Sequence, residues 1–272
     1  MSGQEQGMRV IEHLTELRKR ILWILFIFVL AIIAGFVVAR PVVQYFKQAP
    51  MAAGFTWNVF GLGDGLRVYM QFAFIIAIVI TSPFIMYHLW RFVSPGLRPA
   101  ERKAAGTFII PAFLLFIIGL LLGYYVLFPM IVSFMKKFAV DLGAQPTYGI
   151  AQYFSFMFNI ILPFALLFEL PIVVMFLTRL RILNPIRLKK VRGYAYLVLV
   201  IVASMISPPD FISHISVLIP LLLLYEISVF VSRFVYRKQL KEDEEWEKEF
   251  YADEENEPVL NLTDDEDESS GL

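Results

Sequence analysis

Residues 13–39 read HLTELRKRILWILFIFVLAIIAGFVVA, and this stretch decides the fold. From Ile21 to Ala39 the chain carries no charge, and a helix needs roughly 20 apolar residues to cross the hydrocarbon core of a bilayer. The run is too long for the apolar region of a cleaved signal peptide. The basic cluster RKR just before it predicts that this end of the helix lies on the cytoplasmic side.

Five further apolar segments follow this first one: Val68–Leu89, Ala104–Phe128, about Phe154–Thr178, Tyr194–Ile206 and about Ile215–Val231. They predict an all-α membrane protein with six transmembrane helices. The last two segments are short, because thirteen residues rise only roughly 20 Å against a hydrocarbon core of roughly 30 Å. Pro208 and Pro209 end the fifth helix, since proline cannot continue the hydrogen-bond ladder. We therefore expect these two helices to form a short hairpin that thins the bilayer locally.

The basic residues set the orientation. With the N-terminus inside, 19 of the 24 lysines and arginines fall on the cytoplasmic side, which predicts that both termini are cytoplasmic. The placement predicts a multi-pass membrane protein.

Composition excludes an ordinary soluble domain, because 58% of the 272 residues are hydrophobic, only 18% are charged, and the mean hydropathy is +0.66. The net charge of zero hides a division between residues 1–241, at +14, and residues 242–272, at −14. We expect three regions: a cytoplasmic amphipathic segment (1–20), a transmembrane domain (21–233) and an acidic, mostly disordered, solubilising tail (234–272). The first part of that tail can extend the last helix.

Two of the nine acids before the tail lie within predicted spans. Glu169 lies ten residues before Arg179, about 15 Å below the cytoplasmic end and close to the middle of the bilayer. An ionisable group there costs roughly 2.5–3.5 kcal/mol, so it is a functional candidate. Pro163 and Pro171 flank it, and each frees a backbone carbonyl. Three interpretations stay open: a protonated carboxyl bonded to its own kinked helix, a polar contact for a partner helix or substrate, and a proton relay. For Glu226, seven residues before a basic residue, a structural pairing or snorkelling is favoured.

Glu16 and Glu101 lie on the basic cytoplasmic rim, where an acid needs a cationic partner. Each has an ordinary interpretation. Glu16 can pair with Arg20 one helical turn away, and Glu101 can complement the dipole at the start of the third helix. Together they are two carboxylates at the same membrane depth on the same side.

Enzyme motifs do not account for the chain. It contains no GxSxG, HExxH, P-loop or GxGxxG, it has no cysteine, and its three histidines are scattered over both faces. We expect no catalytic activity, no cofactor and no metal site. The main alternative is a proton- or ion-coupled secondary transporter that uses Glu169, and an intramembrane enzyme is a third class.

Five motifs in order along the chain carry a family resemblance: HLTELRKR at 13–20, YHLWRFVSPGL at 87–97 with ERK at 101–103, FELP at 168–171, SPPD at 207–210 and YEI at 225–227. From about residue 12 to 234 the chain resembles the TatC family, the multi-spanning receptor subunit of the twin-arginine protein translocase. The resemblance implies a concave bundle that binds paired-arginine signal peptides of folded cargo. It also implies export across a bacterial plasma membrane, driven by the proton-motive force, with TatA/TatB-type single-span partners in an oligomeric complex. Membrane lipid is a further partner, and nucleic acid is not.

The resemblance also assigns residues. It implies that Glu16, with its neighbour Arg18, and Glu101 form the twin-arginine site, and that Phe92, Pro95 and Leu97 shape the docking surface. A guanidinium prefers a planar carboxylate, and two adjacent arginines need two acceptors. We therefore expect the partner of Glu16 to arrive on another chain. It implies that Glu169, with Pro171, faces the groove and contacts the signal peptide's apolar region or partner helices.

Overall fold

The computed structural model describes residues 3–52, 55–94, 106–143, 147–208 and 210–256, and these ranges are almost entirely helical. This confirms the predicted all-α class. The elements are α1 (Gly3–Lys47), α2 (Asp64–Val93), α4 (Ile109–Leu122), the π-helix η2 (Gly123–Leu127), α5 (Phe128–Asp141), α6 (Ile150–Leu167), α7 (Leu170–Arg179), α8 (Pro185–Lys190), α9 (Arg192–Ile206) and α10 (Phe211–Asn256).

Five helical stretches are long and apolar enough to cross a membrane: residues 15–47, 64–92, 109–141, 150–179 and 211–248. The prediction that the fifth apolar segment is short is confirmed, because α9 has 15 residues and rises only about 22 Å. The prediction that the sixth is short is wrong, because α10 is one helix of 46 residues. Pro208 and Pro209 precede this helix, Pro220 lies within it, and the charged residues after its apolar part are good helix formers.

The boundary that we predicted at residue 234, between the transmembrane domain and the tail, lies within α10, and the helix continues through it. Residues 234–256 are helical and belong to α10, as expected for the first part of the tail, but over more of its length than a mostly disordered tail allows. This part of the helix forms ion pairs with residues far away in the chain. Residues 257–272 lie outside the described ranges.

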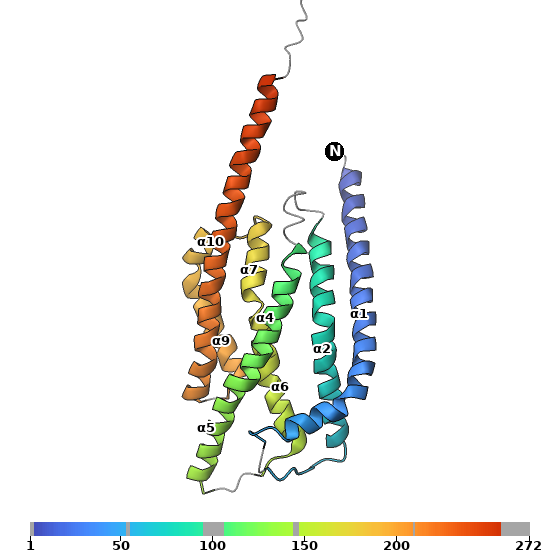
Figure 1. The fold of residues 1–272 in the computed structure, drawn as a ribbon, viewed down its shortest axis with the longest axis vertical. Coiled ribbons are helices and arrows are strands. Elements are labelled where there is room, and N and C mark those ends of the chain that lie inside the picture. The colour runs from blue at the N-terminus through green and yellow to red at the C-terminus, as the bar shows by residue number, and fades with distance from the viewer. Residues whose placement is uncertain (1–2, 53–54, 95–105, 144–146, 209, 257–272) are drawn as a thin grey trace, which may run out of the picture.

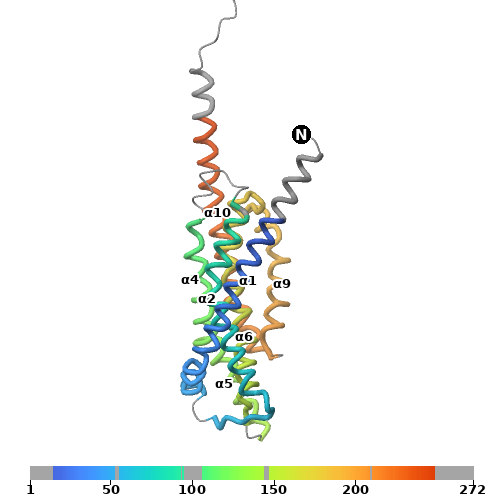
Figure 2. Tube along the Cα trace, turned by 90° about the vertical axis from the view of Figure 1, so that its right-hand side faces the viewer, coloured from blue at the N-terminus to red at the C-terminus, as the bar shows by residue number. Residues whose placement is uncertain are grey.

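The helices stand side by side, and the two chain ends leave the bundle at the same end (Figure 1). Helix α1 packs along α2 at one edge, and α10 packs along α7 at the other. In the span made by α6 and α7, half of the most apolar stretch is buried inside the protein, against 11% for α1. The α6–α7 span is therefore central, whereas α1 exposes most of its apolar surface to lipid. Figure 2 shows α10 projecting beyond the other helices.

At the centre of the bundle, α4 packs closely against the junction between α6 and α7. A Cβ atom added at Gly119 would lie 2.8 Å from the Cα of Ala165 and 2.9 Å from the Cβ of Phe168. The ladder then widens into the π-helix η2, where Gly123 lies against Ile161. A π-helical turn shifts the side chains that follow it around the helix axis, so the side chains of α5 are not in register with those of α4.

At the opposite end of the bundle from the chain termini, an aromatic cap covers the start of α6. Asn58 pairs with the strand-like segment before α6, where its amide donates to Tyr148 and its carbonyl accepts from Ile150, at 3.4 and 2.9 Å. The ring of Trp57 stacks on Phe154, and Lys136 lies 4.1 Å from the centre of the Phe55 ring. This cap fixes the outer end of the central span.

Candidate functional site

The predicted arginine site begins on α1, where the structure gives Glu16 a partner. The side chain of Arg20 donates a hydrogen bond to Glu16 one turn earlier. The side chain of Arg20 is 11% exposed and that of Glu16 is 43% exposed, while Arg18 projects to the surface. Our expectation that no neighbour pairs with Glu16 is therefore wrong. The ordinary helical pair is present, and it holds the carboxylate in place at the surface.

The same end of α1 lies next to the end of α2, from which the rest of the predicted site emerges. Arg20 is close enough to His88 on α2 to interact with it electrostatically, and Arg91 donates to the hydroxyl of Tyr87 at 3.2 Å. Phe92, one of the predicted docking residues, is half-buried on the last turn of α2. The predicted site residues Pro95, Leu97 and Glu101 follow in the loop and lie outside the described residues.

Both ends of this loop are fixed by packing. Ser94 is fully buried where α2 ends. Gly106, where the described chain resumes, lies against the indole of Trp90, because a Cβ there would be 3.1 Å from the ring atom Cζ2. The two described residues that flank the segment with Glu101, Ser94 and Gly106, therefore both lie at the last turn of α2, beside the helix that carries Glu16.

Glu169 lies in the break between α6 and α7. Helix α6 passes through Pro163 without a break, but the helix is interrupted at Phe168 and Glu169, because Pro171 has no amide to donate to the carbonyl four residues earlier. Pro171 then occupies the first turn of α7, where a missing N–H is tolerated. Glu169 occupies the capping position before α7, and its amide donates to the carbonyl of Leu166 at 3.1 Å.

The carboxyl of Glu169 is buried, with 9% of the residue exposed. Its Oε1 atom has no hydrogen-bond partner among the described residues. Oε1 therefore does not form a hydrogen bond with the kinked helix that carries it. A buried acceptor without a hydrogen bond lowers the stability of the fold. This favours the interpretation in which Glu169 receives a donor from a molecule outside the chain.

Glu226 has the structural role that was expected. Its carboxylate accepts from Arg192 at 2.6 Å and from the hydroxyl of Tyr196, which ties α10 to α9. The two acids within the spans thus differ, because Glu226 is paired and half-exposed while Glu169 is buried.

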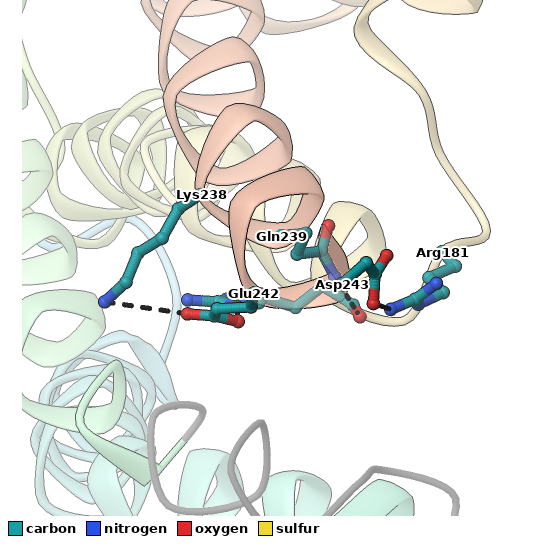
Figure 3. A network of polar contacts seen from close by, with 6 residues as sticks. Arg181, Lys238, Gln239, Glu242 and Asp243 are labelled. Carbon is teal, nitrogen blue, oxygen red and sulfur yellow. Dashed lines mark hydrogen bonds and ion pairs between the residues drawn. The ribbon is translucent and has the colours of Figure 1, made fainter. Parts of the chain in front are cut away.

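Sequence reasoning missed a polar network where α10 leaves the bundle (Figure 3). The side chain of Gln239 donates to the carbonyl of Arg179 at 2.9 Å, and the guanidinium of Arg179 pairs with Glu242 at 3.0 Å. Arg181 pairs with Asp243 at 2.6 Å. The part of the signal that the sequence holds is that residues 238, 239, 242 and 243 share one face of a helix. Their partners near the end of α7 are not indicated by that spacing.

In the described part of the chain, no group of three or more histidine, aspartate or glutamate side chains could hold a metal ion. The site is therefore described by its carboxylates and cations alone.

Comparisons with known proteins agree on one family. The family model described as Sec-independent protein translocase protein (TatC) matches residues 12–220. The chain is 49% identical over 234 residues to the Sec-independent protein translocase protein TatCy of Bacillus subtilis (strain 168), covering 86% of this chain and 92% of that protein. It is 48% identical over 250 residues to a TatC protein of Halalkalibacterium halodurans, covering 92% and 99% of the two chains. A crystal structure of the twin-arginine translocase receptor TatC is similar with a TM-score of 0.71 at 28% identity, and covers 82% of this chain and 99% of that one.

Proposed function

The chain belongs to the TatC family of Sec-independent protein translocase proteins, so it is a protein-translocase component of a membrane, and we propose that it receives signal peptides with paired arginines at Glu16 and Glu101. The alternative of a secondary transporter has no support from the comparisons. The family relationship supports the function of the whole chain, whereas the assignment of single residues is our proposal.

The observation that supports the proposal is that Glu16 lies at the same end of the bundle as the described residues on either side of the segment with Glu101. Glu16 lies on α1 beside the last turn of α2, and Gly106, where the described chain resumes, packs on Trp90 of that same turn. The ion pair with the buried Arg20 holds the Glu16 carboxylate in place before a signal peptide binds, so less side-chain entropy is lost on binding. A carboxylate has about four lone-pair sites, so the pair with Arg20 leaves capacity for an incoming guanidinium.

We further propose that both termini lie in the cytoplasm of a bacterial plasma membrane. The excess of basic residues on one side supports this orientation, and both described chain ends leave the same end of the bundle (Figure 1). TatA/TatB-type single-span subunits complete the complex, export uses the proton-motive force, and Glu169 offers its buried acceptor to a partner helix or to the signal peptide's apolar region.

The test is export of a folded reporter behind a signal peptide with two arginines. We expect Glu16→Ala and Glu101→Ala each to abolish export while the protein stays inserted in the membrane. Asp141→Ala, which removes an exposed acid from the end of α5, is the matched control and should export normally. Site-specific crosslinks from positions 16 and 101 should reach a signal peptide with two arginines and be lost when both are lysine. Normal export by the Glu16→Ala/Glu101→Ala double variant would end the assignment.

A further inference from the structure

Two adjoining cavities lie between α8 and α10, close to the network of Figure 3. The first has a volume of about 280 Å³ and the second about 250 Å³, and both are lined by Tyr236 and Leu240. They are therefore two halves of one groove, divided by the side chains of these two residues. We call it the α8–α10 groove.

Basic side chains line both halves. Lys189, Arg233 and Arg237 line the first cavity, and Arg181 and Arg187 line the second. Asp243, the acid of the second cavity, is paired with Arg181, as Figure 3 shows. The other four cations have no ion-pair partner among the described residues. In addition, the Nε of Arg233 is buried without a hydrogen-bond acceptor. Four like charges around one groove repel one another, and an anion between them removes that cost.

The first cavity has mostly apolar walls, and it lies just beyond the uncharged part of the last span. Pro185 and Ile186 line the first cavity together with Leu240, and the Ile186 side chain is among the most exposed of this region, at 70%. After Glu226, Arg233 is the next charged residue along α10. Basic heads beside exposed apolar walls at a membrane boundary match a molecule with an anionic head and an apolar body.

We propose that the α8–α10 groove binds the headgroup of an anionic phospholipid, and that a diphosphate lipid of the cardiolipin class fits it best. Each half of the groove offers basic side chains to one phosphate, and Tyr236 separates the two positions. The acyl chains leave past Ile186 and Leu240 toward the bilayer. The proposal places the lipid in the cytoplasmic leaflet, and only that choice of leaflet rests on the orientation proposed above.

The experiment measures lipid binding to the purified full-length chain in a neutral detergent, by native mass spectrometry and by the shift of the thermal unfolding midpoint. The probes are cardiolipin, phosphatidylglycerol, phosphatidylcholine and inorganic pyrophosphate. The groove variant is Arg233→Gln/Arg237→Gln, and a second is Arg187→Gln/Lys189→Gln, so that a fold defect in one does not decide the result. The control Lys241→Gln/Lys248→Gln removes two exposed charges from the same helix outside the groove.

We expect wild type and control to bind cardiolipin alike and more tightly than phosphatidylcholine. Each basic residue contributes roughly fivefold to affinity for an anionic lipid surface, so each groove variant should bind roughly 25-fold more weakly. Equal binding by groove variants and control overturns the proposal. Tight pyrophosphate binding without lipid preference overturns it in favour of a free-phosphate site. Displacement of cardiolipin by a peptide copy of the acidic residues 257–272 at equimolar concentration overturns it in favour of the chain's own tail.

Discussion

The buried guanidinium of Arg179, at the end of α7, forms an ion pair with Glu242 of α10, with 3.0 Å between Nη1 and Oε2 across 63 residues of sequence. The Arg179 side chain is only 4% exposed, whereas that of Glu242 is 37% exposed. Lys238 lies 3.8 Å from the same carboxylate and supports it from the preceding turn (Figure 3). The acidic segment that composition assigns to a tail thus fastens α10 onto the central span.

Removing the acid of this pair should destabilise the protein. Glu242→Ala leaves a buried arginine without its partner, and we expect a loss of about 1–3 kcal/mol, reduced from the value for a fully buried pair because Glu242 is partly solvated. Thermal unfolding in detergent measures the change. Glu245→Ala, which removes an exposed acid from the same helix, should change stability by less than about 0.5 kcal/mol. Equal midpoints for both variants would show that the pair contributes nothing.

Arg181 lies where α7 ends, in the left-handed region, with φ at 61°. This conformation costs a residue with a side chain roughly 1–2 kcal/mol, whereas the half-exposed pair with Asp243 returns about 0–1 kcal/mol. We therefore expect Arg181→Gly to be neutral or slightly stabilising. Arg181→Val should cost about 1–3 kcal/mol, because a β-branched side chain fits this region worst.

The control for the valine variant is Lys241→Val on α10, where the helical backbone makes the same change cost at most about 0.7 kcal/mol. Of the three variants, Arg181→Gly should have the highest unfolding midpoint, Lys241→Val the second and Arg181→Val the lowest. A glycine variant as unstable as the valine variant would mean that the ion pair, and not the backbone, governs this position.

Gly119 sets the distance between α4 and the junction that carries Glu169. Gly119→Val should cost about 1–3 kcal/mol, because its Cβ would stand 2.8 Å from the backbone of Ala165, and backbone cannot rotate away. Gly193 in α9 is the matched position, since nothing lies within 4 Å of its Cβ site. Gly193→Ala should be neutral or stabilising by up to about 1 kcal/mol. Unfolding of the two purified variants tests the contrast, and a stable Gly119→Val protein would contradict the close approach.

Local patterns foretold the spans but not the contacts between them. The uncharged run from Ile21 predicts α1, and the proline pair at 208–209 predicts the end of α9, because hydropathy and missing amides act within a few residues. The extension of α10 was expected from the sequence, but its pairing with Arg179 and Arg181, 63 and 62 residues away from their partners, follows from no local pattern.

The candidate site shows the same division. Proline 171 predicts a disturbed helix beside Glu169, and the four-residue spacing allows the pair between Glu16 and Arg20. Whether that pair is made depends on the packing of Arg20 against α2, which sequence spacing leaves open. Buried and exposed ion pairs can have the same sequence spacing, so only the folded structure distinguishes them.

Glu169 should show a split between stability and function. Its Oε1 is buried and has no partner among the described residues, so Glu169→Leu removes an unsatisfied acceptor, and we expect unchanged or slightly higher stability. Crosslinking of partner helices or precursor to α6 and α7 should nevertheless fall, while crosslinking of the paired arginines to position 16 persists. Glu169→Gln keeps an acceptor of similar shape and should retain more crosslinking than leucine. Glu226→Leu is the control from the same membrane region, and it should lose stability because Arg192 and Tyr196 lose their acceptor. A Glu169→Leu protein that is destabilised as much as Glu226→Leu and crosslinks as well as wild type would make Glu169 a structural residue.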